Sequence, residues 1–213
     1  EDKLGPGPWI VRSSCGREDS SNESNAGAFL SLLDIDKFSL NDAVNEVIAS
    51  YGENVPSDEV LIQPMLQAVV HSGVAFSHDP NTCAPYRIVN WSDGEDTAAV
   101  TGGLGGRIWQ QAASSEATAP QEIMPVIGLL DELLVLFADT PVDCEYAVTE
   151  ENGTKILWLL QARPLILIGT PESTNVQTDR LQKIYDKVVR GMGPHPLLMG
   201  QQTVYGEMPD WNP

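Results

Sequence analysis

The alternation of apolar and polar residues predicts helices and strands in clustered order. Amphipathic periodicity predicts helices over about residues 40–51, 120–138 and 175–190. Runs rich in β-branched and aromatic residues predict strands at 9–14, 59–66, 68–77, 85–91 and 97–103. This order indicates an α+β fold, with a mixed or antiparallel sheet packed by helices, rather than a doubly wound parallel sheet.

Residues at the helix ends refine these boundaries. Ser39 precedes the first helix with Asp42 three residues on, as in a capping box, and Gly52 follows as a C-terminal stop. Pro125 is expected to delay or kink the start of the second helix. After the third helix, residues 192–213 are expected to form a loop or linker, because they carry several Gly and Pro residues.

A hairpin is predicted over residues 142–164, where two apolar runs meet at an Asn-Gly dipeptide. Its candidate functional residues lie at the far ends of the two arms: Asp143 and Glu145 on one, Gln161 and Arg163 on the other. A two-residue turn would divide these four between the two faces of the sheet. We therefore expect a three-residue loop at 152–154, which brings all four onto one face.

Two interpretations of this polar patch remain open. With the expected loop, Glu145 faces Gln161 and Asp143 faces Arg163. Carboxylate and amide oxygens suit Mg²⁺, and a guanidinium can bind a phosphate with two hydrogen bonds, so the patch is compatible with a nucleoside triphosphate. The alternative is an exposed Asp–Arg pair at strand ends, which contributes little stability.

Two further segments can each be interpreted either as a phosphate-binding element or as an ordinary surface loop. Arg12 ends the first strand and precedes a Gly- and Ser-containing loop, which is compatible with a phosphate clamp or with a solvated loop arginine. Residues 101–106, TGGLGG, lack the lysine of a phosphate-binding P-loop and are interpreted as a flexible turn. Four tryptophans are expected to serve core or strand packing: Trp9, Trp91, Trp109 and Trp158.

Charge narrows the range of partners. The 213 residues include 12 Lys and Arg against 30 Asp and Glu, a net charge of −18, which argues against nucleic acid or an anionic membrane as partner. No apolar run reaches the roughly 18 residues of a membrane span. Three cysteines, odd in number and far apart, favour reduced thiols and a cytoplasmic protein. The absence of an initial Met suggests a piece of a larger protein.

Four segments in collinear order resemble one known family. VRSSCGREDS…AGAF, AVNEVIASYG, VLIQPML…SGVAFSHDP and VDCEYAV…LLQARP, within residues 9–166, resemble the ATP-binding domain of the phosphoenolpyruvate synthase and pyruvate phosphate dikinase family. The resemblance implies an ATP-grasp fold, in which ATP lies between two lobes. It divides the chain into a partial nucleotide-binding domain, the C-terminal lobe, at 1–168 and a helix plus linker at 169–213.

The resemblance also implies roles for the patch residues. Arg12 would hold the ATP phosphates and Arg163 would contact the β- or γ-phosphate, so both would be catalytic residues. Glu145 and Gln161 would bind Mg²⁺, and Asp143 would support that site and belong to the nucleotide-binding residues. These roles fit phosphoryl transfer, which depends on positioning and charge neutralisation.

The remaining implications concern the adenine, the acceptor and the partners. Gln63 and Met65 would border the adenine, largely through backbone groups. The expected cofactors are ATP and Mg²⁺, and the expected activity is a phosphotransferase that passes a phosphoryl group to a histidine on another domain, converting pyruvate to phosphoenolpyruvate. The phosphohistidine and pyruvate-binding domains would be partners.

Departures from the family pattern support other readings. The family's nucleotide-binding lysine lies in a lobe upstream of VRSS, and only eleven residues precede Arg12, so this chain alone is expected to be inactive. The alternatives are a catalytically degenerate scaffold that binds a nucleotide or a protein, and a relative that phosphorylates a different acceptor, such as a glucan or an antibiotic.

Overall fold

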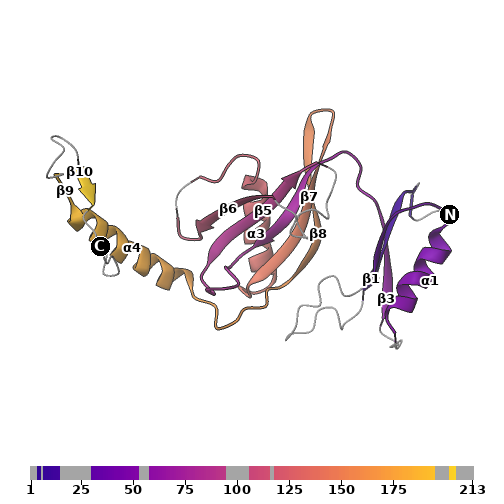
Figure 1. Ribbon diagram of the computed structural model, residues 1–213, viewed down its shortest axis with the longest axis horizontal. Coiled ribbons are helices and arrows are strands. Elements are labelled where there is room, and N and C mark those ends of the chain that lie inside the picture. Colours follow the sequence, from indigo (N-terminus) through magenta and orange to yellow (C-terminus); the bar gives the residue numbers. More distant parts are fainter. Residues whose placement is uncertain are drawn as a thin grey trace, which may run out of the picture.

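The structure is a computed structural model that describes residues 4, 5, 7–14, 30–52, 58–94, 106–115, 118–194 and 202–204. These residues form an α+β fold, as predicted, with two larger antiparallel sheets and three helices. Each of these sheets is packed by one helix, and the third helix leads away from the second sheet (Figure 1). No helix in the described part of the chain is both long and apolar enough to cross a membrane.

The first sheet is built around the predicted N-terminal strand. Its order is β2 (Ser31–Ile35), β1 (Trp9–Ser14), β3 (Glu59–Pro64), with both pairs antiparallel. Helix α1 (Leu40–Ser50) packs on it, and Val11 and Val47 are fully buried between helix and sheet. Strand β2 was not predicted, because the polar segment before it was interpreted as continuous loop.

The start of α1 differs from the predicted capping box. The Ser39 side chain makes no hydrogen bond to the helix; its Oγ donates to Asp36 Oδ1 at 2.7 Å instead. Asp36 Oδ1 also accepts from the backbone N–H groups of Phe38 and Ser39, and these bonds lower the pKa of the Asp36 carboxyl. The capping-box prediction is therefore wrong, whereas Gly52, with φ of +70°, follows the helix as the predicted stop.

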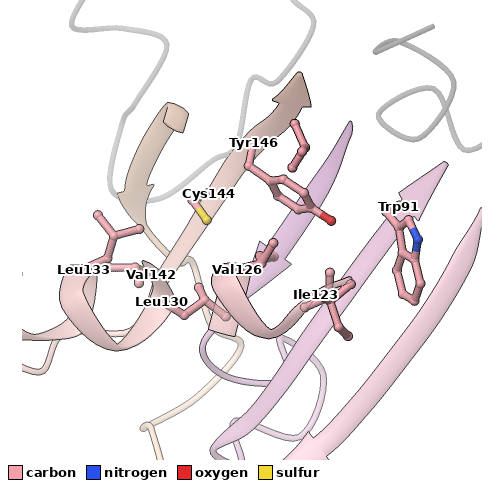
Figure 2. Packing of buried hydrophobic residues seen from close by; sticks show 11 residues of the cluster. Trp91, Ile123, Val126, Leu130, Leu133, Val142, Cys144 and Tyr146 are labelled. Atoms are coloured by element: carbon pink, nitrogen blue, oxygen red, sulfur yellow. The ribbon is translucent and has the colours of Figure 1, made fainter. Parts of the chain in front are cut away.

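The second sheet holds the larger core. Its order is β6 (Arg107–Ala112), β5 (Tyr86–Asp93), β4 (Val69–Phe76), β7 (Val142–Glu151), β8 (Thr154–Pro164), antiparallel throughout. Helix α3 (Met124–Leu136) covers one face and buries Val126 and Leu130 against Val142 and Tyr146 (Figure 2). Pro125 lies in the first turn of α3, so the predicted delay in its start is confirmed.

The C-terminal part is only partly as predicted. Helix α4 (Thr174–Gly191) is confirmed, and Ser173 Oγ accepts from the Val176 N–H at its start. The segment expected to be loop or linker contains two short strands, β9 (Met192–Pro194) and β10 (Gln202–Val204), which pair antiparallel. Three-residue strands are too short to produce a recognisable alternation in sequence. The predicted strand at 97–103 and all of the predicted turn at 101–106 except Gly106 lie outside the described residues.

The hairpin turn also corrects the sequence analysis. Strand β7 ends at Glu151 and β8 begins at Thr154, so the loop contains only Asn152 and Gly153 rather than three residues. Both have positive φ, +52° and +78°, as in a type I′ turn, whose twist matches that of the flanking strands. The expected three-residue loop is therefore wrong.

Replacing Gly153 by alanine tests this turn. A Cβ on Gly153 would meet no atom within 4 Å, so the cost is confined to a left-handed backbone, and we expect a loss of about 1 kcal/mol in the free energy of unfolding. Gly128→Ala is the control, because Gly128 is exposed within α3 and also has open space; this change should add about 0.5–1 kcal/mol. Urea unfolding measures both, and equal effects would contradict the turn geometry.

Candidate functional site

The register of β7 and β8 changes partway along the hairpin. From the turn as far as the pair Tyr146–Leu159, the pairing follows from a two-residue loop. At the next pair, Glu145 lies opposite Gln161, which leaves Leu160 as an extra residue in a β-bulge. The bulge therefore supplies the additional residue that the sequence analysis had assigned to the loop.

This bulge brings the four candidate residues onto one face. Asp143 lies opposite Arg163, and Glu145 opposite Gln161, so the predicted pairing is confirmed although its expected cause is not. Along β7 these carboxylates alternate with Cys144 and other residues that face α3. The polar patch formed by Asp143, Glu145, Gln161 and Arg163 thus lies on the sheet face opposite α3.

Within the polar patch, Asp143 orients Arg163. Arg163 Nε donates to Asp143 Oδ1 at 3.0 Å and to Oδ2 at 3.1 Å, and Nη2 donates to Oδ2 at 3.1 Å. The side chains are 15% exposed for Asp143 and 25% for Arg163. A partly buried, forked ion pair of this kind fixes the direction of the guanidinium more strongly than an exposed pair does.

Arg12 joins the polar patch from the other sheet. It lies on β1, and its Nη2 donates to Gln161 Oε1 at 3.5 Å, a contact between residues 149 positions apart. The structure therefore brings together five of the predicted site residues. A guanidinium lies beside the amide oxygen that the sequence analysis assigned to Mg²⁺.

An apolar cavity of about 110 Å³ lies between the same two sheets. Its walls come from β1 and β2, from residues 65–68 between β3 and β4, from Val69 at the start of β4, and from Ala147 and the bulge residue Leu160. Met65 lines this cavity, and its N–H donates to the Pro8 carbonyl at 2.9 Å. Gln63 lies on β3 opposite Ile10 and is not part of the lining.

Several cavity residues were not predicted from the sequence. Ile10, Leu33 and Leu160 are apolar strand residues with no chemical signature, and they meet only because the two sheets face each other. The bulge at Leu160 could be inferred from the sequence only by combining two features. A two-residue Asn-Gly turn places the four polar residues on one face only if one strand contains an extra residue.

The opposite face of the hairpin is apolar around Cys144. Cys144 is buried between the two carboxylate positions, and burial, followed by the charge of Asp143, raises the pKa of its thiol to about 12. The thiol is therefore neutral near pH 7 and unsuited to nucleophilic attack.

A double-mutant cycle on Asp143 and Arg163 measures how firmly the guanidinium is held. We expect a coupling free energy of about 1–2 kcal/mol from the single and double alanine variants in urea unfolding. The matched control is Glu150–Lys155 of the same hairpin, 3.9 Å apart and 39% and 57% exposed, for which coupling should stay below about 0.5 kcal/mol. If the coupling free energy of Asp143 and Arg163 were no larger than that of Glu150 and Lys155, Asp143 would not orient the Arg163 guanidinium as proposed.

Comparison with protein-family models finds no match for this chain, and no curated protein matches it.

Proposed function

We propose that this chain is the ATP-binding part of a phosphoenolpyruvate synthase-like dikinase with an ATP-grasp fold. The observation that carries the proposal is the meeting of Arg12 with the polar patch of the hairpin, beside an apolar cavity between the same two sheets. A nucleotide needs both environments, because its base is apolar on its faces and its phosphates are anionic. The two lie next to each other along β8, since Leu160 lines the cavity and Gln161 belongs to the patch.

The donor atoms of the polar patch fit Mg²⁺. Glu145 offers a carboxylate and Gln161 an amide oxygen, which are the hard oxygen ligands that Mg²⁺ prefers. The described residues contain no cluster of three or more His, Cys, Asp or Glu side chains of the kind that encloses a metal. Such a small protein contribution suits Mg²⁺ that is bound mainly by phosphate oxygens and water. Bound Mg²⁺ would neutralise phosphate charge during transfer.

The two arginines, Arg163 and Arg12, would both contact the phosphates. Arg163 is held by Asp143, so its direction is set before a ligand arrives, and it would contact the β- or γ-phosphate. Arg12 reaches the patch from the opposite sheet and would hold the phosphates from that side. Asp143 is a positioning residue in this scheme, because both of its oxygens accept from Arg163.

The activity would be a phosphotransferase that acts with other domains. The phosphoryl group would pass to a histidine of a phosphohistidine domain and then to pyruvate on a third domain. A relative that serves another acceptor, such as a glucan or an antibiotic, would use the same nucleotide site. An upstream lysine-bearing lobe and a downstream histidine domain in a longer protein would favour a dikinase.

A binding module without turnover is the second candidate. It is favoured by one observation: the Arg12–Gln161 and Asp143–Arg163 contacts satisfy these side chains within the chain, as a structural bridge between two sheets would require. Such a module would bind a nucleotide or a protein through the same surface.

Titration with Mg·ATP, followed by amide chemical shifts in NMR, tests the site. We expect weak binding, with Kd on the order of 1 mM, and shifts concentrated at residues 10–12, 65–69, 143–147 and 160–163. Arg12→Gln and Glu145→Gln should each weaken binding about tenfold, because each removes a charged contact to phosphate or metal. The response should also require Mg²⁺.

Two exposed positions provide matched controls. Arg180→Gln, on α4, and Glu132→Gln, on α3, make the same chemical changes far from the patch and should leave the titration unaltered. Chemical-shift changes confined to residues outside the polar patch and the apolar cavity would contradict the proposed nucleotide site. Equal affinities of the Arg12 and Arg180 variants for Mg·ATP would contradict it as well.

A further inference from the structure

Strand β8 leaves one edge of the second sheet open. Among the described strands it pairs only with β7, and it forms the end of the sheet order. The hairpin tip continues past β4, whose last pairing with β7 is at Thr149, and it projects beyond the neighbouring strands in Figure 1. An open edge of this kind presents backbone donors and acceptors to another strand.

The turn determines which backbone groups face outward. In a two-residue hairpin the residues that flank the turn share their backbone hydrogen bonds, and the pairs then alternate. Thr154, Ile156 and Trp158 therefore direct their N–H and C=O groups toward β7. Lys155 and Leu157, and likewise Leu159, direct theirs away from the sheet.

The same stretch carries exposed apolar side chains. Ile156 is 42% exposed, Trp158 41% and Leu159 45%, and Lys155 is the only charged residue within 154–160. Natural edge strands are commonly protected by charges, prolines or bulges. Here the bulge at Leu160 interrupts the edge only at its far end, and Lys155 is the single charge along it, so residues 154–159 form a largely apolar edge.

A hollow lies beside this edge on the α3 side of the sheet. It has a volume of about 710 Å³ and is lined by His71, Val148, Lys155, Leu157, Gln121 and Pro125, among others. It exists because α3 begins only at Met124, whereas the hairpin extends further. A strand added beside β8 would place alternate side chains about 5 Å from Lys155 and Leu157, within reach of the hollow.

We propose that the 154–159 edge of β8 binds an extended segment of another protein by strand addition, with apolar residues at alternate positions and basic residues at its ends. Backbone hydrogen bonds would supply affinity, and the hollow would select the alternate side chains. This site is distinct from the polar patch, which lies on the other side of the bulge and on the opposite face of the sheet.

The charge of the chain indicates which kind of segment would bind at the 154–159 edge. Glu151 is exposed beside the edge at the hairpin tip; Glu150, next to it, is 3.9 Å from Lys155, and Glu122, which lines the hollow, pairs with Arg107 at 3.1 Å. The whole chain has a net charge of −18, which attracts a basic segment and repels a second copy of itself. These features favour a basic partner over self-association through β8.

Hydrogen exchange with a synthetic probe tests the proposal. The probe is a nine-residue peptide in which three valines alternate with two threonines between pairs of lysines. On binding, the amides of Lys155, Leu157 and Leu159 should exchange at least tenfold more slowly, while those of Ile156 and Trp158, already bonded to β7, should change little. A probe with N-methylated amides at the pairing positions should cause no protection.

Two variants at Lys155 distinguish the contribution of its backbone N–H from that of its side chain. Lys155→Pro removes one outward N–H at an edge position that tolerates proline, and it should weaken binding at least tenfold relative to Lys155→Ala. Uniform protection along β8, no protection at millimolar probe, or equal binding of the methylated probe would overturn the proposal. A concentration-dependent dimer that protects the same three amides without probe would assign the edge to a second copy and also overturn it.

Discussion

The strict alternation of side chains along a strand is the constraint on which the candidate site depends. A shift of one residue in the β7–β8 register would move Gln161 and Arg163 to the α3 side, away from Asp143 and Glu145. That move would bury a guanidinium against an apolar core and expose core residues in exchange. The bulge at Leu160 prevents this conflict, because it lets a favourable two-residue turn coexist with a polar patch on the outer face.

The few basic residues have two distinct uses in this acidic chain. Arg87, with a side chain only 15% exposed, ties α3 to the sheet through Asp131 and the Ser77 carbonyl. Arg107 bridges Asp93 and Glu122 while its guanidinium lies over the Trp91 ring. Arg12 and Arg163, in contrast, both lie at the polar patch, where Arg12 contacts Gln161 and Arg163 contacts Asp143. There the two guanidinium groups lie among the carboxylates of Asp143 and Glu145, so the patch combines hydrogen-bond donors and acceptors.

Sequence patterns predicted the long elements and missed those that depend on tertiary contact. The three helices and the strands around Val11, Val74 and Val89 follow from local periodicity, which core burial then satisfies. Strands β2 and β6 border larger sheets and have mixed burial, so they lack a clear alternation. The site residues of the hairpin were predictable because polar residues stand out within apolar strands. The cavity was not, since its walls join segments more than a hundred residues apart.

The position of the bulge also bears on how related chains would be aligned. Removal of Leu160 would leave every remaining β7–β8 pair intact, because Glu145 would still lie opposite Gln161 and Tyr146 opposite Leu159. A relative with a regular hairpin would therefore be one residue shorter at this point and would keep the same polar face. An alignment that placed this gap at the Asn152–Gly153 turn would instead match core residues to site residues along the arm. A change of length at Leu160 would thus leave the pairing on both sides of the bulge unaltered, although it falls within a strand, where insertions and deletions are usually selected against.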